Sequence, residues 1–238
     1  FLFFLVKGWI QRPLIPKLLA MFVLGGLQGV LGWYMVKSGL VDNPHVSQYR
    51  LTAHLGLAIL IYAYMFYVAL GLWLGGRHSG NTPLRLRRAT TLLMGLIFIT
   101  ILSGGFVAGL KAGYAYNTFP LMDGRWIPEV IFMQEPLWRN FFENIATVQF
   151  QHRLLATLAF LGVILLWLVA RRTTLPAAVS TGLLLMLAAI VLQVSLGIST
   201  LLLHVPVPLA ATHQAGALLL LTMVLYTHYR MTYTTGDS

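Results

Sequence analysis

Cysteine is absent from all 238 residues, and Asp and Glu together contribute only six. Without a thiol, the chain has no disulfide, thiolate nucleophile, iron–sulfur cluster or cysteine-ligated metal. No glycine-rich phosphate loop, nucleotide-binding fingerprint or Ser/His/Asp order occurs either. The residue type best able to carry chemistry in this chain is therefore histidine.

Long apolar segments dominate the sequence. Hydrophobic residues make up 58% of the chain and charged residues 9%, with a mean hydropathy of +0.79. Apolar stretches of about 20 residues recur, the length that a helix needs to cross a bilayer, whereas the alternating segments of a β-barrel are not visible. We predict an all-α, polytopic membrane protein with six full spans: Leu18–Val36, Tyr49–Leu74, Ala89–Leu110, Ile145–Ala170, Leu175–Leu203 and Leu209–Tyr229. Phe1–Ile10 is too short to span and is interpreted as the inner end of a helix that begins before Phe1.

The net charge of +10 is unevenly distributed around these spans. One side carries Lys7, Arg12, Lys17, Arg77, Arg85, Arg87, Arg88, Arg171, Arg172 and Arg230. On the other side, Lys37, Arg50, Lys111, Arg125 and Arg139 are balanced by Asp42, Asp123, Glu129, Glu135 and Glu143. A basic excess marks the inner side of a membrane protein. The pattern therefore predicts a multi-pass protein of the bacterial cytoplasmic or mitochondrial inner membrane, with no nucleic-acid partner.

Three histidines, His54, His152 and His213, lie a few residues inside the outer ends of predicted spans. An imidazole at membrane depth needs a partner, often a metal or a proton path. A zinc site would need closely spaced ligands, usually with carboxylates or thiolates, but these histidines lie on separate helices without acids. Haem iron commonly takes single histidines from neighbouring helices. A hydrogen-bonded core histidine is the alternative for each residue alone, and three at matching depth favour haem. Solvated positions are expected for His45, His78, His204 and His228.

Weak internal similarity relates two halves of the chain. An offset of 159 connects Phe1-Leu2, Arg12 and His54 with Phe160-Leu161, Arg171 and His213, and Gln28–Gly32 resembles Gln193–Gly197 at an offset of 165. We therefore predict two pseudo-symmetric four-helix bundles. The N-terminal bundle, 1–88, is incomplete, and the C-terminal bundle, 89–238, carries the outer loop 111–144. The offset also predicts a histidine eight residues before Phe1, which would pair with His54 as His152 pairs with His213.

Small residues surround the three histidines on their own helical faces. They are Ala58 near His54, Ala156 near His152, and Ala210, Gly216 and Ala217 near His213. Such residues leave room for a flat porphyrin, although tight helix packing would use them equally well.

Two arginines and one aromatic segment are further candidates. Arg50, one turn outward of His54, is a possible partner of haem propionates. Arg153 lies inside a span and must face a polar partner. Alternatively, either arginine anchors its helix end at the lipid headgroups. The aromatic segment 126–142 is expected to form one or two short helices on the outer membrane surface.

Several longer stretches resemble the haem A synthase family over nearly the whole chain. They are Gly29–Gly39, Val46–Gly56, Ser103–Gly113, Tyr116–Pro120, Phe142–Arg153 and Pro208–Gln214. The block Trp33-Tyr-Met-Val-Lys-Ser-Gly39 and the absence of cysteine resemble the alphaproteobacterial and mitochondrial branch of that family.

This resemblance implies an oxidoreductase that converts a ring methyl of haem O to a formyl group through a hydroxymethyl intermediate. It implies that His152 and His213 ligate a haem b cofactor, which relays electrons, and that His54 is an axial ligand of haem O. The partner histidine and the family's catalytic glutamate would precede Phe1, so no catalytic acid is assigned here. Expected partners are membrane lipids, haem O synthase, an electron donor and a second copy of the chain.

Two other functions fit the residues alone. A non-catalytic di-haem carrier would pass electrons from quinol to an acceptor and hold two permanent haems. A haem transporter or chaperone would need no second, fixed haem. An exchangeable site beside a permanent one would favour the synthase.

Overall fold

The computed structural model describes residues 1–39, 46–78 and 82–234. Its long helices are α2 (Ile15–Gly39), α3 (Gln48–Leu74), α4 (Leu84–Gly109), α6 (Ile145–Ala170), α7 (Ala177–Leu202) and α8 (Val207–Thr232). The short elements are α1 (Leu2–Val6), η1 (Arg12–Leu14), β1 (Arg77–His78), η2 (Ala112–Tyr114), η3 (Leu137–Arg139), α5 (Asn140–Glu143) and β2 (Tyr233–Thr234). Within the described part of the chain, six helices are long and apolar enough to cross a membrane. The prediction of an all-α polytopic membrane protein is confirmed.

Local sequence signals explain where the long helices begin and end. Prolines directly precede α4, α7 and α8, where their missing N–H costs no helical hydrogen bond. The side chain of Asn144 caps α6 by accepting hydrogen bonds from the backbone N–H groups of Ala146 and Thr147. Gly75 ends α3 with a φ of +60°, which glycine adopts without strain. These signals fix the depth at which residues near the helix ends lie.

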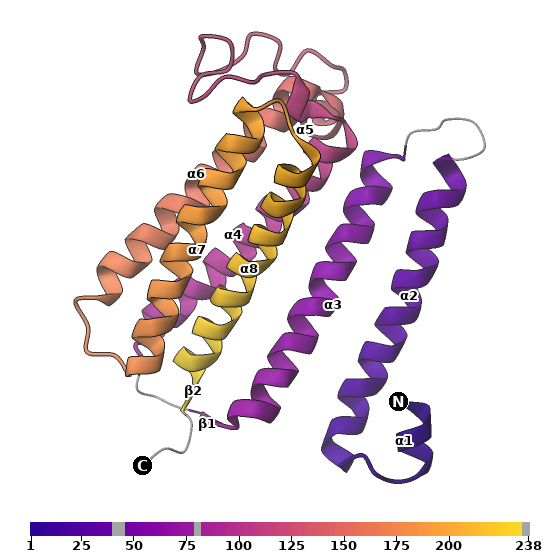
Figure 1. The fold of residues 1–238 in the computed structure, drawn as a ribbon, viewed down its shortest axis with the longest axis vertical. Coiled ribbons are helices and arrows are strands. Elements are labelled where there is room, and N and C mark those ends of the chain that lie inside the picture. Colours follow the sequence, from indigo (N-terminus) through magenta and orange to yellow (C-terminus); the bar gives the residue numbers. More distant parts are fainter. Residues whose placement is uncertain (40–45, 79–81, 235–238) are drawn as a thin grey trace.

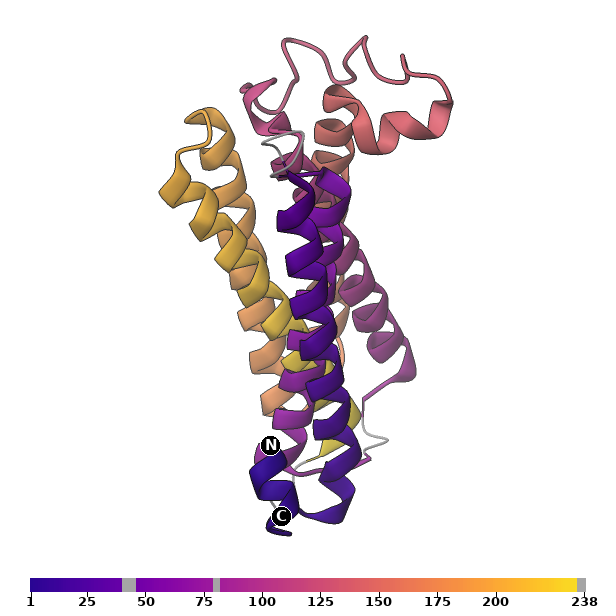
Figure 2. The ribbon, with the colours of Figure 1, turned by 90° about the vertical axis from the view of Figure 1, so that its right-hand side faces the viewer.

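Four helices form a bundle, and two others stand beside it (Figure 1). Helices α6 and α8 each pack on both α4 and α7, so α6 and α8 lie diagonally across the bundle. Helix α3 packs on α4 and α8, and α2 packs on α3 at the edge of the molecule, as the turned view shows (Figure 2). The chain before α2 folds back on it, with the rings of Phe1 and Phe22 5.9 Å apart.

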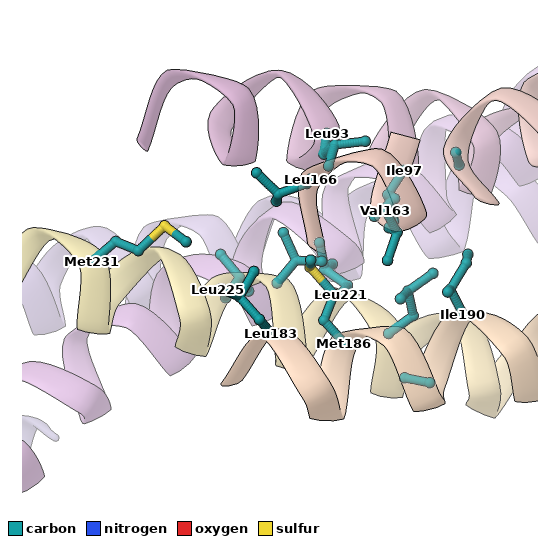
Figure 3. Packing of buried hydrophobic residues seen from close by; sticks show 14 of the residues in the cluster. Leu93, Ile97, Val163, Leu166, Leu183, Met186, Ile190, Leu221, Leu225 and Met231 are labelled. Carbon is teal, nitrogen blue, oxygen red and sulfur yellow. The ribbon is translucent and has the colours of Figure 1, made fainter. Parts of the chain in front are cut away.

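The hydrophobic core lies inside the four-helix bundle (Figure 3). Val163, Met186 and Val224, from α6, α7 and α8, are fully buried. By contrast, the most apolar stretch of α2 contains no buried residue. In a membrane protein, such a face is compatible with lipid contact.

At the inner end, the loop after α3 is tied to the end of α8. Strands β1 and β2 pair antiparallel, and the Tyr229 hydroxyl donates to the backbone oxygen of Gly75 at 2.5 Å. His228 lies within hydrogen-bond distance of Tyr67 and Thr91 and is partly buried. The expectation that His228 is solvated is therefore wrong, because three helices converge on it. His204 is exposed as expected, and His45 lies outside the described residues.

At the outer end, the aromatic segment forms the expected short helices only over 137–143, as η3 and α5. Trp126 and Met133 are 73% and 71% exposed. Asn140 is fully buried and holds the segment together by donating to the backbone oxygens of Gln134 and Leu137. This arrangement places large apolar side chains at the outer membrane surface, where the interface can accept them.

Candidate functional site

The three candidate histidines lie at one depth, near the outer ends of their helices. His54 is six residues from the start of α3, His152 seven from the start of α6 and His213 six from the start of α8. At a rise of about 1.5 Å per residue, each lies roughly 10 Å inside its helix end. The predicted common depth is therefore present in the fold.

Each of these imidazoles rests against a glycine of an adjacent helix. A Cβ atom built on Gly32 of α2 would lie 3.0 Å from Cε1 of His54, and one on Gly104 of α4 would lie 3.3 Å from Cε1 of His152. On Gly197 of α7, it would lie 2.8 Å from Cε1 of His213. A Cβ on Gly197 would therefore force the ring of His213 to move, and one on Gly32 or Gly104 would make a tight contact with the facing ring.

The position of the proton on His152 follows from its hydrogen bonds. The Ser103 hydroxyl donates to the backbone oxygen of Thr100 at 2.7 Å, and its own oxygen, Oγ of Ser103, lies 2.7 Å from Nδ1 of His152. Since the hydroxyl proton is already used, Ser103 accepts a hydrogen bond from Nδ1–H. The lone pair of His152 is then on Nε2, the arrangement by which proteins orient a metal-ligating histidine.

His213 faces the same bundle interior as His152. His152 packs against Gly104 of α4 and His213 against Gly197 of α7, and the helices that carry them, α6 and α8, lie diagonally across the bundle. Nδ1 of His213 is buried without a hydrogen-bond partner. A buried polar atom without a partner is costly unless a ligand changes its surroundings. Two imidazoles from diagonal helices, with glycines beside both, fit the two axial positions of a haem.

His54 lies in the separate pair formed by α2 and α3. The side-chain nitrogen of Gln28 is 3.3 Å from Nε2 of His54 and donates to its backbone oxygen at 3.1 Å. Nδ1 of His54 is buried without a partner. The structure therefore brings together the residues that the repeat aligned, Gln28 and Gly32 with His54, and likewise Gln193 and Gly197 with His213.

The two arginines occupy different environments. The guanidinium of Arg50 lies 4.2 Å from the ring centroid of Tyr34, between α3 and α2. Arg153 donates to the backbone oxygens of Tyr116 and Thr118 at 2.8 and 2.9 Å. Its predicted polar partner is thus the outer loop, which Gln149 also holds through the backbone oxygen of Tyr116.

Sequence reasoning missed three elements of the site. Ser103 and Gly104 begin a Ser-Gly-Gly run, a signal that small residues approach another helix closely, but nothing indicated the histidine. The amide of Gln28 was aligned with Gln193 without an assigned contact. Among the described residues, no group of three or more His, Asp or Glu side chains could hold a metal ion.

Several known proteins are similar to this chain in sequence. The family model described as "Cytochrome oxidase assembly protein" (COX15-CtaA) matches residues 1–225. The chain is 59% identical over 234 residues to a protein of Nitrosospira multiformis named "Heme A synthase", covering 97% of this chain and 65% of that protein. It is 48% identical over 232 residues to "Heme A synthase COX15" of Bos taurus, covering 94% and 56%.

The chain thus spans just under two thirds of the bacterial relative and little more than half of the bovine one. Together with the six apolar helices, these relatives identify a multi-pass inner-membrane protein. By the match over residues 1–225 and the identity along almost its whole length, the chain belongs to the COX15-CtaA family of cytochrome oxidase assembly proteins.

Proposed function

We propose that this chain acts as a haem A synthase, which oxidises a ring methyl of haem O to the formyl group of haem A. The observation that carries the proposal is the repeated glutamine, glycine and histidine arrangement in α2–α3 and α7–α8. It provides two imidazole sites of one design, one in each proposed half, 1–88 and 89–238. The printed names of the relatives support the same function.

His152 and His213 are the proposed axial ligands of a haem b cofactor. Bound there, haem b would supply one-electron transfer. Ser103 holds the Nε2 lone pair of His152 toward the bundle, and Gly104 and Gly197 leave space for both rings. The buried apolar side chains below, from α6, α7 and α8, exclude water from this interior.

His54 is the proposed axial ligand of the substrate, haem O. It lies between α2 and α3, outside the four-helix bundle, and the outer face of α2 is exposed. A substrate that arrives through the bilayer would find this site more accessible than the bundle interior. Arg50 lies one turn outward and is the proposed partner of a propionate, for which its guanidinium would leave the Tyr34 ring.

A non-catalytic di-haem electron carrier is the rival function, and none of the similar proteins described above is named as one. The two sites also differ in their surroundings, since one lies inside a bundle and the other in a helix pair.

Haem O synthase, an electron donor and a second copy of the chain remain proposed partners. The exposed aromatic side chains of the outer segment fit contact with lipid headgroups.

Co-expression with a source of haem O tests the proposed function. We expect cells to accumulate haem A, identified by chromatography of extracted pigments, only when the chain is produced together with that source. The matched control is the His54→Ala variant at equal expression. Two permanently bound haems with reversible redox behaviour and no haem A would instead identify the carrier.

Gly197→Ala is expected to lower the affinity for haem b by about ten-fold or more, the usual effect of disturbing the support of a metal ligand. The added Cβ would lie 2.8 Å from Cε1 of His213, so the ring must move. Gly95→Ala is the matched control, because a Cβ on Gly95 meets nothing within 4 Å. Haem titration of both purified variants measures the effect. Equal affinities would contradict the proposal that Gly197 leaves the room that the ring of His213 needs to bind haem.

A further inference from the structure

Gln28 contacts the nitrogen of His54 that an iron would use. Its side-chain nitrogen donates to the backbone oxygen of His54, and a carbonyl oxygen can only accept a hydrogen bond. This contact fixes the orientation of the Gln28 amide, with its NH₂ group toward His54. The second hydrogen of that group then points to Nε2 of His54, 3.3 Å away.

The same contact determines the tautomer of His54. Because the amide NH₂ of Gln28 only donates, Nε2 of His54 must be the acceptor, and the ring proton is on Nδ1. Nδ1 is buried without a partner. With the ring proton on Nδ1, the lone pair is on Nε2, where it accepts from Gln28 and where a haem iron would bind.

The equivalent glutamine in the second half lies differently. Oε1 of Gln193 is buried without a hydrogen bond, as is Oε1 of Gln28, but it lies at the place that a side chain on residue 216 would fill. Gly216 leaves that space open, whereas Leu57 stands 159 positions earlier, at the corresponding place in α3. Among the described residues, no hydrogen bond joins the Gln193 side chain to His213. The residue at this place therefore differs between the two halves, Leu57 against Gly216, and so does the position of the glutamine.

We propose that Gln28 is a positioning residue that competes with haem iron for Nε2 of His54 and thereby makes haem exchange at this site fast. The inference rests on the proposed function, in which His54 binds a substrate that must leave as product. Iron that binds His54 displaces the Gln28 hydrogen bond, and on dissociation the amide takes the lone pair again. His213 lacks such a competitor, which suits a cofactor that stays bound.

The test is the dissociation rate of added ferric haem b from the purified protein, followed by transfer to excess apomyoglobin. Gln28→Leu keeps the side-chain volume but removes the competing donor. We expect about five-fold slower release from the exchangeable site, the effect of one lost hydrogen bond of ordinary net strength. Gln11→Leu is the matched control, because Gln11 is exposed in the chain before α2, and its release of the added haem should equal that of the unmodified protein.

A purely structural role for Gln28 predicts the opposite sign, since loss of its contacts would loosen His54 and speed release. Unchanged or faster release from Gln28→Leu would therefore overturn the inference. Leu57→Gly is a second variant. It opens beside Gln28 the space that Gly216 leaves beside Gln193, so that the Gln28 side chain can move away from His54. Release of haem should therefore also become slower. An unchanged rate in Leu57→Gly would likewise count against the competition.

His54→Ala separates this inference from the proposed function. If the variant no longer binds the added haem but Gln28→Leu releases haem at the normal rate, the His54 site is correct and the competition is wrong. If His54→Ala binds and releases the added haem normally, His54 is not the ligand, and both the site and the competition are wrong.

Discussion

Purified His152→Ala and His213→Ala variants are each expected to contain less than about a tenth of the haem b bound by the unmodified protein. Disturbing only the residues that support a metal ligand already costs about 10- to 100-fold in affinity, and loss of the ligand itself should cost more. The two histidines lie on diagonal helices, α6 and α8, so neither can take the place of the other. Pyridine haemochrome per protein measures the loss.

His228→Ala is the control for this pair of variants. His228 is also a partly buried histidine on α8, but it lies at the inner end, within hydrogen-bond distance of Tyr67 and Thr91. This variant should keep its haem b even if it is somewhat less stable. Full haem b content in both His152→Ala and His213→Ala would refute the assignment of the cofactor site.

His54→Ala is expected to abolish haem A formation, by at least about a hundred-fold, while most haem b remains bound. The variant removes the proposed substrate ligand from α3 and leaves the bundle of α4, α6, α7 and α8 untouched. The measurement is haem A formed from added haem O, together with haem b content on the same sample.

The control is His204→Ala, because His204 is exposed at the outer turn between α7 and α8. It should form haem A at the normal rate. If His54→Ala instead loses haem b and still converts haem O, the cofactor and substrate sites have been assigned to the wrong halves.

Much of the fold could be predicted because membrane helices are defined by length and apolarity. The predicted span Ile145–Ala170 coincides with α6, and the other five differ from the observed helices by a few residues at their ends. The largest difference is at the start of α4, which begins at Leu84 rather than Ala89. Hydropathy misses these first turns because they contain Arg85, Arg87 and Arg88.

The histidines and the repeat were visible in the sequence because both are properties of residue type and spacing. The two offsets, 159 and 165, differ because the chain from Gly32 to His54 is six residues longer than the chain from Gly197 to His213. The contacts of Ser103 and Gly104 with His152 were not predictable. They depend on the crossing of α4 and α6, which no periodic pattern records.

The partner of Arg153 could not be identified from the sequence, because it is a set of backbone groups. Arg153 was predicted to need a polar partner, and in the structure it donates hydrogen bonds to the backbone oxygens of Tyr116 and Thr118. Carbonyl groups are present at every residue, so the sequence contains no signal for such a partner. Which residues bind haem remains a prediction, and the variants above are its tests.

The central claim is that one chain holds a fixed haem b and an exchangeable haem O at two imidazole sites of similar design. Haem O labelled with an iron isotope tests it most directly, when added to the purified protein with an electron donor and followed by mass spectrometry of the extracted haems. We predict that the label appears in haem A, that haem b stays unlabelled, and that His54→Ala produces no labelled haem A. Labelled haem A from the His54→Ala variant, or label in the haem b fraction, would contradict the account.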